Sequence, residues 1–100
     1  MIKMRNVFSS MEKAQGELLQ KVAVSSSDGR LRPVREKTLE SFEGAWALAV
    51  RRGFALDERE VTSLYLLCLK KGLASEGIQV SPNLVAANER VIALIEEAAR

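Results

Sequence analysis

The sequence predicts an all-α protein, built as a four-helix bundle or as packed helical hairpins with the third helix central. Two patterns support this. Apolar residues recur at helical spacing in four stretches, and capping or turn residues bound those stretches. With 47% hydrophobic and 28% charged residues, the chain also has ordinary globular composition. We therefore expect one domain over residues 1–100, with helices at about 6–23, 33–52, 57–71 and 82–99.

The first expected helix carries Phe8, Met11, Leu18 and Val22 at spacings of three, seven and four. This spacing places the four side chains on one face of a helix. Residues 25–29 read Ser-Ser-Ser-Asp-Gly, which is a strong loop signal and should end the helix.

The second expected helix starts with Pro33, because proline suits the first helical position. Gly53 suits the left-handed position after the helix end, and Phe54 can then fold back onto the last turn. The apolar residues of this helix share one face: Leu39, Phe42, Trp46, Ala49 and Val50.

The third expected helix has the clearest start, since Asp57 and Glu60 have the spacing of a capping box. The uninterrupted apolar run of residues 64–69 predicts that this helix is the most buried. A strand is the alternative for this run, but the helix signals on either side favour a helix. The helix should end before Gly72.

The fourth expected helix is capped by Ser81 and has Pro82 at its first position. Leu84, Val91 and Ile95 follow at heptad-like spacing, so they should form an apolar stripe.

Histidine is absent from the sequence, and Cys68 is the only cysteine. One chain therefore lacks the ligands for a His/Cys metal site and the base that activates a serine or cysteine nucleophile. Cys68 lies in the apolar run and is expected to be a core residue. We expect no cofactor and no enzymatic activity.

The net charge of +2 comes from 15 basic and 13 acidic residues, which is too even for a protein that mainly coats phosphate backbones. No uncharged apolar stretch reaches the length of a membrane span, and the first residues do not resemble a signal peptide. A cytoplasmic location without membrane contact is expected.

A local basic cluster precedes and begins the second helix. Arg30, Arg32 and Arg35 belong to it, and they could contact an acidic partner or nucleic acid.

The second half of the chain resembles the helix-turn-helix of LuxR-type regulators. The resemblance rests on Glu-Arg-Glu-Val at 58–61, Lys-Gly-Leu-Ala-Ser at 71–75 and Val-Ser-Pro at 80–82. It implies a small DNA-binding regulator that uses residues 57–99. Two features depart from that pattern: residues 76–79 are too few for a scanning helix, and no basic residue precedes Arg90 in the recognition helix.

The main hypothesis is a protein–protein interaction module, comparable to small helical adaptors, chaperones or anti-activators that sequester a partner protein. Four short helices carry more apolar surface than one small domain readily covers, and an uncovered helical face often marks an interface. A homodimer through the second or fourth helix is expected, with Asn88 fixing its register. The expected interface residues are Phe42, Trp46, Leu84, Asn88, Val91 and Ile95.

Overall fold

A computed structural model describes residues 4–100, with side chains from residue 7 onward. The described chain is all-helical. It contains α1 (Met4–Lys21), α2 (Leu31–Arg51), α3 (Glu58–Ser75), a 3-10 turn η1 (Pro82–Leu84) and α4 (Glu89–Ala98). The all-α prediction is confirmed, and residues 4–100 contain no strand.

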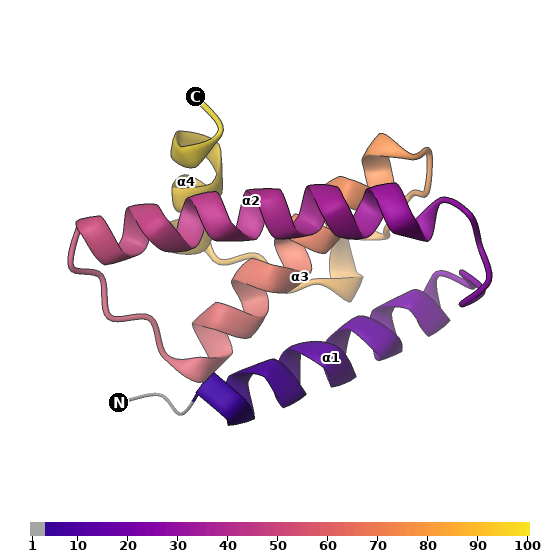
Figure 1. Cartoon of the computed structure of the whole chain (residues 1–100), viewed down its shortest axis with the longest axis horizontal. Coiled ribbons are helices and arrows are strands. Elements are labelled where there is room, and N and C mark those ends of the chain that lie inside the picture. The colour runs from indigo at the N-terminus through magenta and orange to yellow at the C-terminus, as the bar shows by residue number, and fades with distance from the viewer. Residues whose placement is uncertain (1–3) are drawn as a thin grey trace.

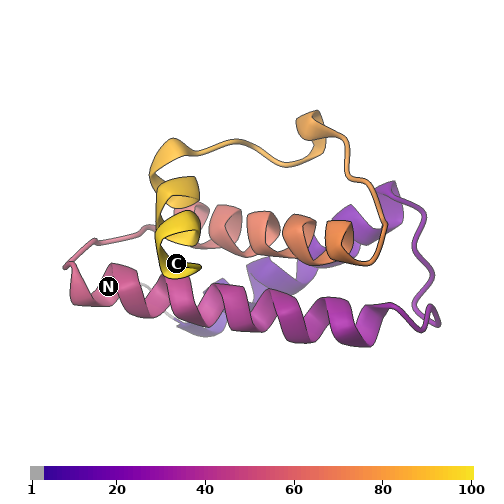
Figure 2. The ribbon, with the colours of Figure 1, turned by 90° about the horizontal axis from the view of Figure 1, so that it is seen from above.

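The third helix is central, as predicted: α3 packs against α1, α2 and α4. Figure 1 shows α1 and α2 diverging toward the start of α1 and the end of α2, with α3 between them. In Figure 2, α3 lies between α2 and the segment that leads to α4, and α4 crosses α2 and α3 steeply.

Two clusters of buried side chains form the core. The larger joins all four α-helices and includes Met11, Ala45, Leu64 and Leu94. The smaller lies under the segment after α3, which buries Ile78, Val80 and Val85 against α2 and α3. A loop segment therefore supplies core residues that a fourth long helix was expected to supply.

Three helix ends use the same closing motif. The amide of the residue after a left-handed position donates to a carbonyl five residues back: Val24 to Leu19, Phe54 to Ala49 and Ile78 to Leu73. The left-handed residues are Ala23, Gly53 and Gly77. The expected roles of Gly53 and Phe54 are thus confirmed, whereas the expected end of the third helix before Gly72 is wrong.

Gly72 lies inside α3 because its missing side chain permits close packing on α2. A Cβ atom at Gly72 would lie 2.9 Å from Thr38 Oγ1 and 3.0 Å from the Val34 carbonyl oxygen. Helix α2 also starts earlier than expected, at Leu31, where the Leu31 amide donates to the Asp28 carbonyl at 3.1 Å. Pro33 is then the third helical residue, where a missing N–H still costs no helical hydrogen bond.

The expected fourth helix over residues 82–99 is the largest error. Its first part is η1, and the chain then runs extended at Val85 and Asn88 before α4 begins. Asn88 is the N-cap of α4, because its Oδ1 accepts the Val91 amide at 3.2 Å. This cap and the burial of Val85 explain the late start.

Candidate protein-interaction site

A cluster of aromatic side chains joins α2 to α3. Phe42 and Trp46, both half-buried on α2, stack with ring centroids 6.2 Å apart. Phe42 also meets the ring of Tyr65 edge-on at 5.7 Å. This arrangement fixes which side of α2 faces Tyr65.

Tyr65 extends the cluster to α1, because its hydroxyl donates a hydrogen bond to the Gln15 side-chain oxygen. Burial raises the pKa of Tyr65 above its ordinary value, while the charge of Arg35 lowers it and that of Glu12 raises it. Arg35 on α2 and Glu12 on α1 therefore both act on this hydroxyl from the two neighbouring helices. Both side chains are exposed.

An exposed apolar stripe on α2 continues from the aromatic pair. Leu39 is 49% exposed and Val50 is 62% exposed. The spacing of Leu39, Phe42, Trp46 and Val50 is three, four and four residues, which places all four on one side of the helix. The core contacts of α2 come from its other apolar side: Leu31, Val34, Thr38, Ala45, Leu48 and Ala49.

Helix α1 adds Phe8, which is 52% exposed. Phe8 precedes Gln15 by seven residues, or nearly two helical turns, so it lies on the same side of α1 as Gln15. Through Gln15, that side of α1 borders Tyr65, whose ring contacts Phe42 of α2. We call Phe8, Leu39, Phe42, Trp46 and Val50 the α1–α2 face.

Sequence reasoning named Phe42 and Trp46 as interface residues and placed Phe8, Leu39 and Val50 only on apolar helix faces. The signal that was overlooked is the breadth of the apolar surface on α2. Leu31, Val34, Ala45 and Leu48 already supply a complete buried side. The stripe from Leu39 to Val50 is therefore additional.

The expected interface residues of the fourth helix are not available on the surface of this chain. Val91 is completely buried and Ile95 is 8% exposed, both within the larger core cluster. Leu84 is half-buried against the smaller cluster. Asn88 caps α4 instead of lying between Leu84 and Val91 on one helix. The folded chain therefore does not present the apolar stripe on which the expected interface of this helix and the register role of Asn88 depended.

The three arginines of the basic cluster do not share one set of contacts. Arg30 forms a 2.7 Å ion pair with Asp28, and its hydrogen bonds lower the pKa of that carboxyl to about 2. Arg32 lies 3.5 Å from Glu36. Arg35 lies seven residues before Phe42, so it shares the side of α2 that carries this ring. Two of the three positive charges are thus countered by a neighbouring carboxylate.

The segment that resembles a helix-turn-helix contains no scanning helix: between Ser75 and Glu89 the described chain forms only the turn η1. Arg90, the first basic residue of the last helix, lies 4.7 Å from the ring centroid of Phe54 and 3.9 Å from Glu60. The other exposed residues along α4 are Glu89, Ala93 and Glu96. Apart from Arg90, the exposed residues of α4 include no basic or amide side chain of the kind that reads base edges.

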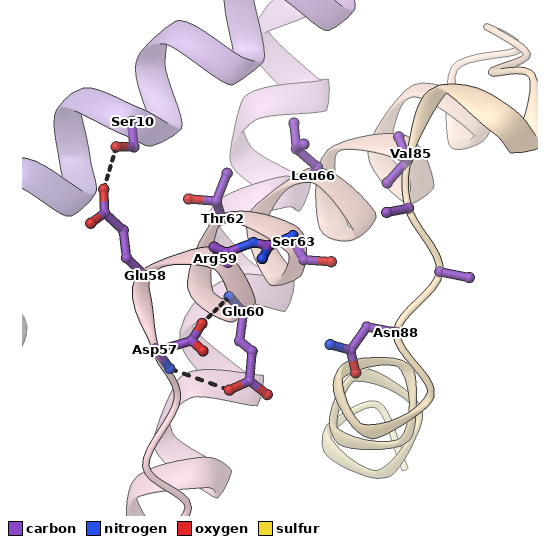
Figure 3. Close-up of a pocket in the computed structure, with 12 residues that line it drawn as sticks. Ser10, Asp57, Glu58, Arg59, Glu60, Thr62, Ser63, Leu66, Val85 and Asn88 are labelled. Atoms are coloured by element: carbon purple, nitrogen blue, oxygen red, sulfur yellow. Dashed lines mark hydrogen bonds between the residues drawn. The ribbon is translucent and has the colours of Figure 1, made fainter.

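A hollow of about 760 Å³ lies between the start of α3 and residues 85–88 (Figure 3). Its carboxylates already have partners. Glu58 accepts the Ser10 hydroxyl at 2.7 Å, while Asp57 and Glu60 form the predicted capping box. The Ser63 hydroxyl is buried without a hydrogen-bond partner in the described chain. Besides capping groups and small side chains, the hollow is lined by Leu66 and the exposed Arg59.

Cys68 is a buried thiol at the centre of α3. Burial raises its pKa to about 11, although the charge of Lys71 lowers it. Such a thiol is a poor nucleophile at neutral pH. Among the residues that the structure describes, no three Asp, Glu, Cys or His side chains lie where they could hold a metal ion.

Comparison of the chain with protein-family models, curated proteins and solved structures finds no match. None of the described helices has both the length and the apolar character needed to cross a membrane.

Proposed function

We propose that this chain is a non-enzymatic protein–protein interaction module, and that its partner docks on the α1–α2 face. The observation that carries the proposal is the exposure of Phe8, Leu39 and Val50 beside the half-buried pair Phe42 and Trp46. Exposed apolar side chains that share one side of a helix, as Leu39 and Val50 do on α2, are typical of an interaction site. An adaptor, a chaperone or an anti-activator fits this description by analogy.

The energetic argument is that a partner removes this surface from water. Completing the burial of Phe8, Leu39 and Val50, each roughly half exposed, contributes about 1 kcal/mol per side chain. The aromatic pair adds the rigid anchors that interaction hot spots favour.

A homodimer is proposed only through this same face. Dimerisation through α4 would need Val91 and Ile95 on the surface, and both are buried. A second copy would therefore compete with the partner for α2.

Affinity capture tests the proposal. The tagged chain is incubated with a lysate of its native host, treated with nuclease at moderately high salt, and its co-purifying proteins are identified by mass spectrometry. A stoichiometric protein that is retained by the wild type and lost by the Leu39→Ser/Val50→Ser variant supports the proposal. The matched control is Ala93→Ser, an exposed apolar site on α4. Loss of all protein, with nucleic acid recovered when nuclease is omitted, would refute it in favour of a nucleic-acid binder.

A further inference from the structure

We infer that the hollow between the start of α3 and residues 85–88 binds an extended, basic peptide segment of another protein, which pairs with residues 85–88 as a β-strand. We call residues 85–88 the extended segment. No residue of the α1–α2 face lines this hollow, so the inference goes beyond the proposed function.

The extended segment has the geometry of a β-strand but no strand beside it. Val85 has φ of −126° and ψ of 120°, and Asn88 has φ of −131° and ψ of 109°, which are strand dihedral angles. Figure 2 shows the chain running extended alongside α3 before it enters α4. Within the described chain, the backbone N–H and C=O groups of Val85, Ala86 and Ala87 form no hydrogen bond.

These unpaired groups select a partner in the β conformation. In a strand, the N–H and C=O groups of one residue point to the same edge, and those of the next residue point to the other edge. Val85 and Ala87 therefore supply one edge, and Ala86 and Asn88 supply the other. A peptide added as a strand satisfies such an edge, whereas a helix bonds its own peptide groups internally. Ala86 and Ala87 are exposed, so the edges are accessible.

The hollow supplies the space that the side chains of such a peptide need. Its volume of about 760 Å³ lies in the range of pockets that hold ligands. The Ser63 hydroxyl lines the hollow and is buried without a hydrogen-bond partner in the described chain. Figure 3 shows the Ser63 oxygen directed from α3 toward the extended segment. A polar group of the bound peptide would satisfy this hydroxyl.

The charge of the wall selects a basic peptide. Three carboxylates, of Asp57, Glu58 and Glu60, line the hollow with one guanidinium, of Arg59. The hydrogen bonds that Asp57 and Glu58 accept come from uncharged groups, so they leave both negative charges in place. Glu60 has Arg90 at 3.9 Å, and one negative charge remains in excess even when that arginine is counted. A lysine or arginine side chain complements this excess.

A second copy of the chain is a poorer occupant for the same reason. Two copies that paired through their extended segments about a two-fold axis would bring two such acidic walls together. Like charges placed opposite each other weaken an association. The occupant that fits is a basic segment of another protein.

The test uses three designed peptides of about eight residues with blocked ends, in which valine alternates with lysine, glutamine or glutamate. Nuclear magnetic resonance of the isotope-labelled chain measures both the affinity and the hydrogen exchange of each backbone amide. The lysine peptide should bind most tightly and the glutamate peptide most weakly. At saturation it should slow exchange about tenfold or more at one alternate pair of amides, Val85 with Ala87 or Ala86 with Asn88. The other pair should stay fast, because its edge remains unpaired.

Matched variants separate backbone pairing from charge. Ala86→Pro and Ala87→Pro each remove one amide, on opposite edges, and only the variant on the protected edge should bind about two- to tenfold more weakly. Glu58→Gln should weaken binding of the lysine peptide about two- to fivefold and leave the glutamine peptide unaffected. Glu43→Gln, an exposed site on α2 outside the hollow, is its control. The spectrum of each variant checks that it is folded.

Four outcomes would overturn the inference: no protected amide in the extended segment, equal protection of all four, equal binding of the glutamate peptide, or protection that rises with the concentration of the chain alone. The last outcome would assign the extended segment to a second copy. The Leu39→Ser/Val50→Ser chain should bind the lysine peptide as the wild type does, because neither residue lines the hollow. A failure of strand pairing therefore leaves the proposed function standing, and the reverse also holds.

Discussion

Gly72 of α3 packs directly on Thr38 of α2, which is completely buried and donates its hydroxyl to the Val34 carbonyl at 2.7 Å. The contact is closer than a side chain at position 72 allows. It sets how closely α2 and α3, the two helices that hold the Phe42–Tyr65 ring contact, approach each other at this point.

Gly72→Ala should lower the free energy of unfolding by about 1–2 kcal/mol. The added methyl group would overpack the crossing, and this penalty exceeds the gain in helix propensity. Gly16→Ala is the control, since a Cβ atom at this position in α1 meets nothing within 4 Å. The control should raise stability by about 0.5–1 kcal/mol. Urea unfolding curves compare the two, and a stabilised Gly72→Ala variant would show that the crossing is looser than described.

Ala23→Gly should stabilise the protein by about 1 kcal/mol. Ala23 has φ of 57° at the end of α1, in the left-handed region where a Cβ atom is strained. Gly53 and Gly77 occupy the corresponding positions after α2 and α3. A rise in the melting temperature of roughly 4–8 °C is expected for a domain of this size. An unchanged or lower melting temperature would contradict the assigned backbone.

Asn88→Ala should cost about 1 kcal/mol of stability, because it removes the cap of α4. Asn88→Asp keeps a capping oxygen and should retain most of the stability. The loss should be the same at all protein concentrations. A change in oligomeric state, measured by sedimentation, would instead favour the register role that the sequence suggested.

Cys68 should resist modification by a thiol reagent at pH 8 until the chain unfolds, because it is buried. Its pKa is raised from 9.0 to about 11, so burial of the neutral thiol stabilises the fold below pH 9. That contribution should disappear as the pH rises from 9 toward 11. Across this range, the free energy of unfolding of the wild type should fall relative to that of Cys68→Ala, because only the wild type loses the contribution of the thiol. A parallel pair of curves would contradict the raised pKa.

Local signals in the sequence predicted much of the fold. The capping box of Asp57 and Glu60 and the turn at Gly53 depend on neighbouring residues alone, and both are present. The start of α4 could not be read in this way, since Ser81 and Pro82 form a plausible helix start. Tertiary burial of Val85 and the later cap at Asn88 decide against it.

The candidate site, too, could be predicted from the sequence only in part. Helical periodicity identifies apolar sides but does not say which of them another helix covers. Val91 and Leu39 both lie on predicted apolar stripes, yet the first is completely buried and the second is half exposed. The difference depends on where α4 crosses α2, which is a long-range property of the packing.

The most direct test of the central claim is the dissociation constant of the captured partner for the wild type, for Leu39→Ser/Val50→Ser and for Ala93→Ser, measured by calorimetry. Docking on the α1–α2 face predicts at least about tenfold weaker binding by the double variant, equivalent to about 1.4 kcal/mol, and wild-type affinity for Ala93→Ser. Equal affinity of all three folded proteins would contradict the claim and move the interaction site away from this face.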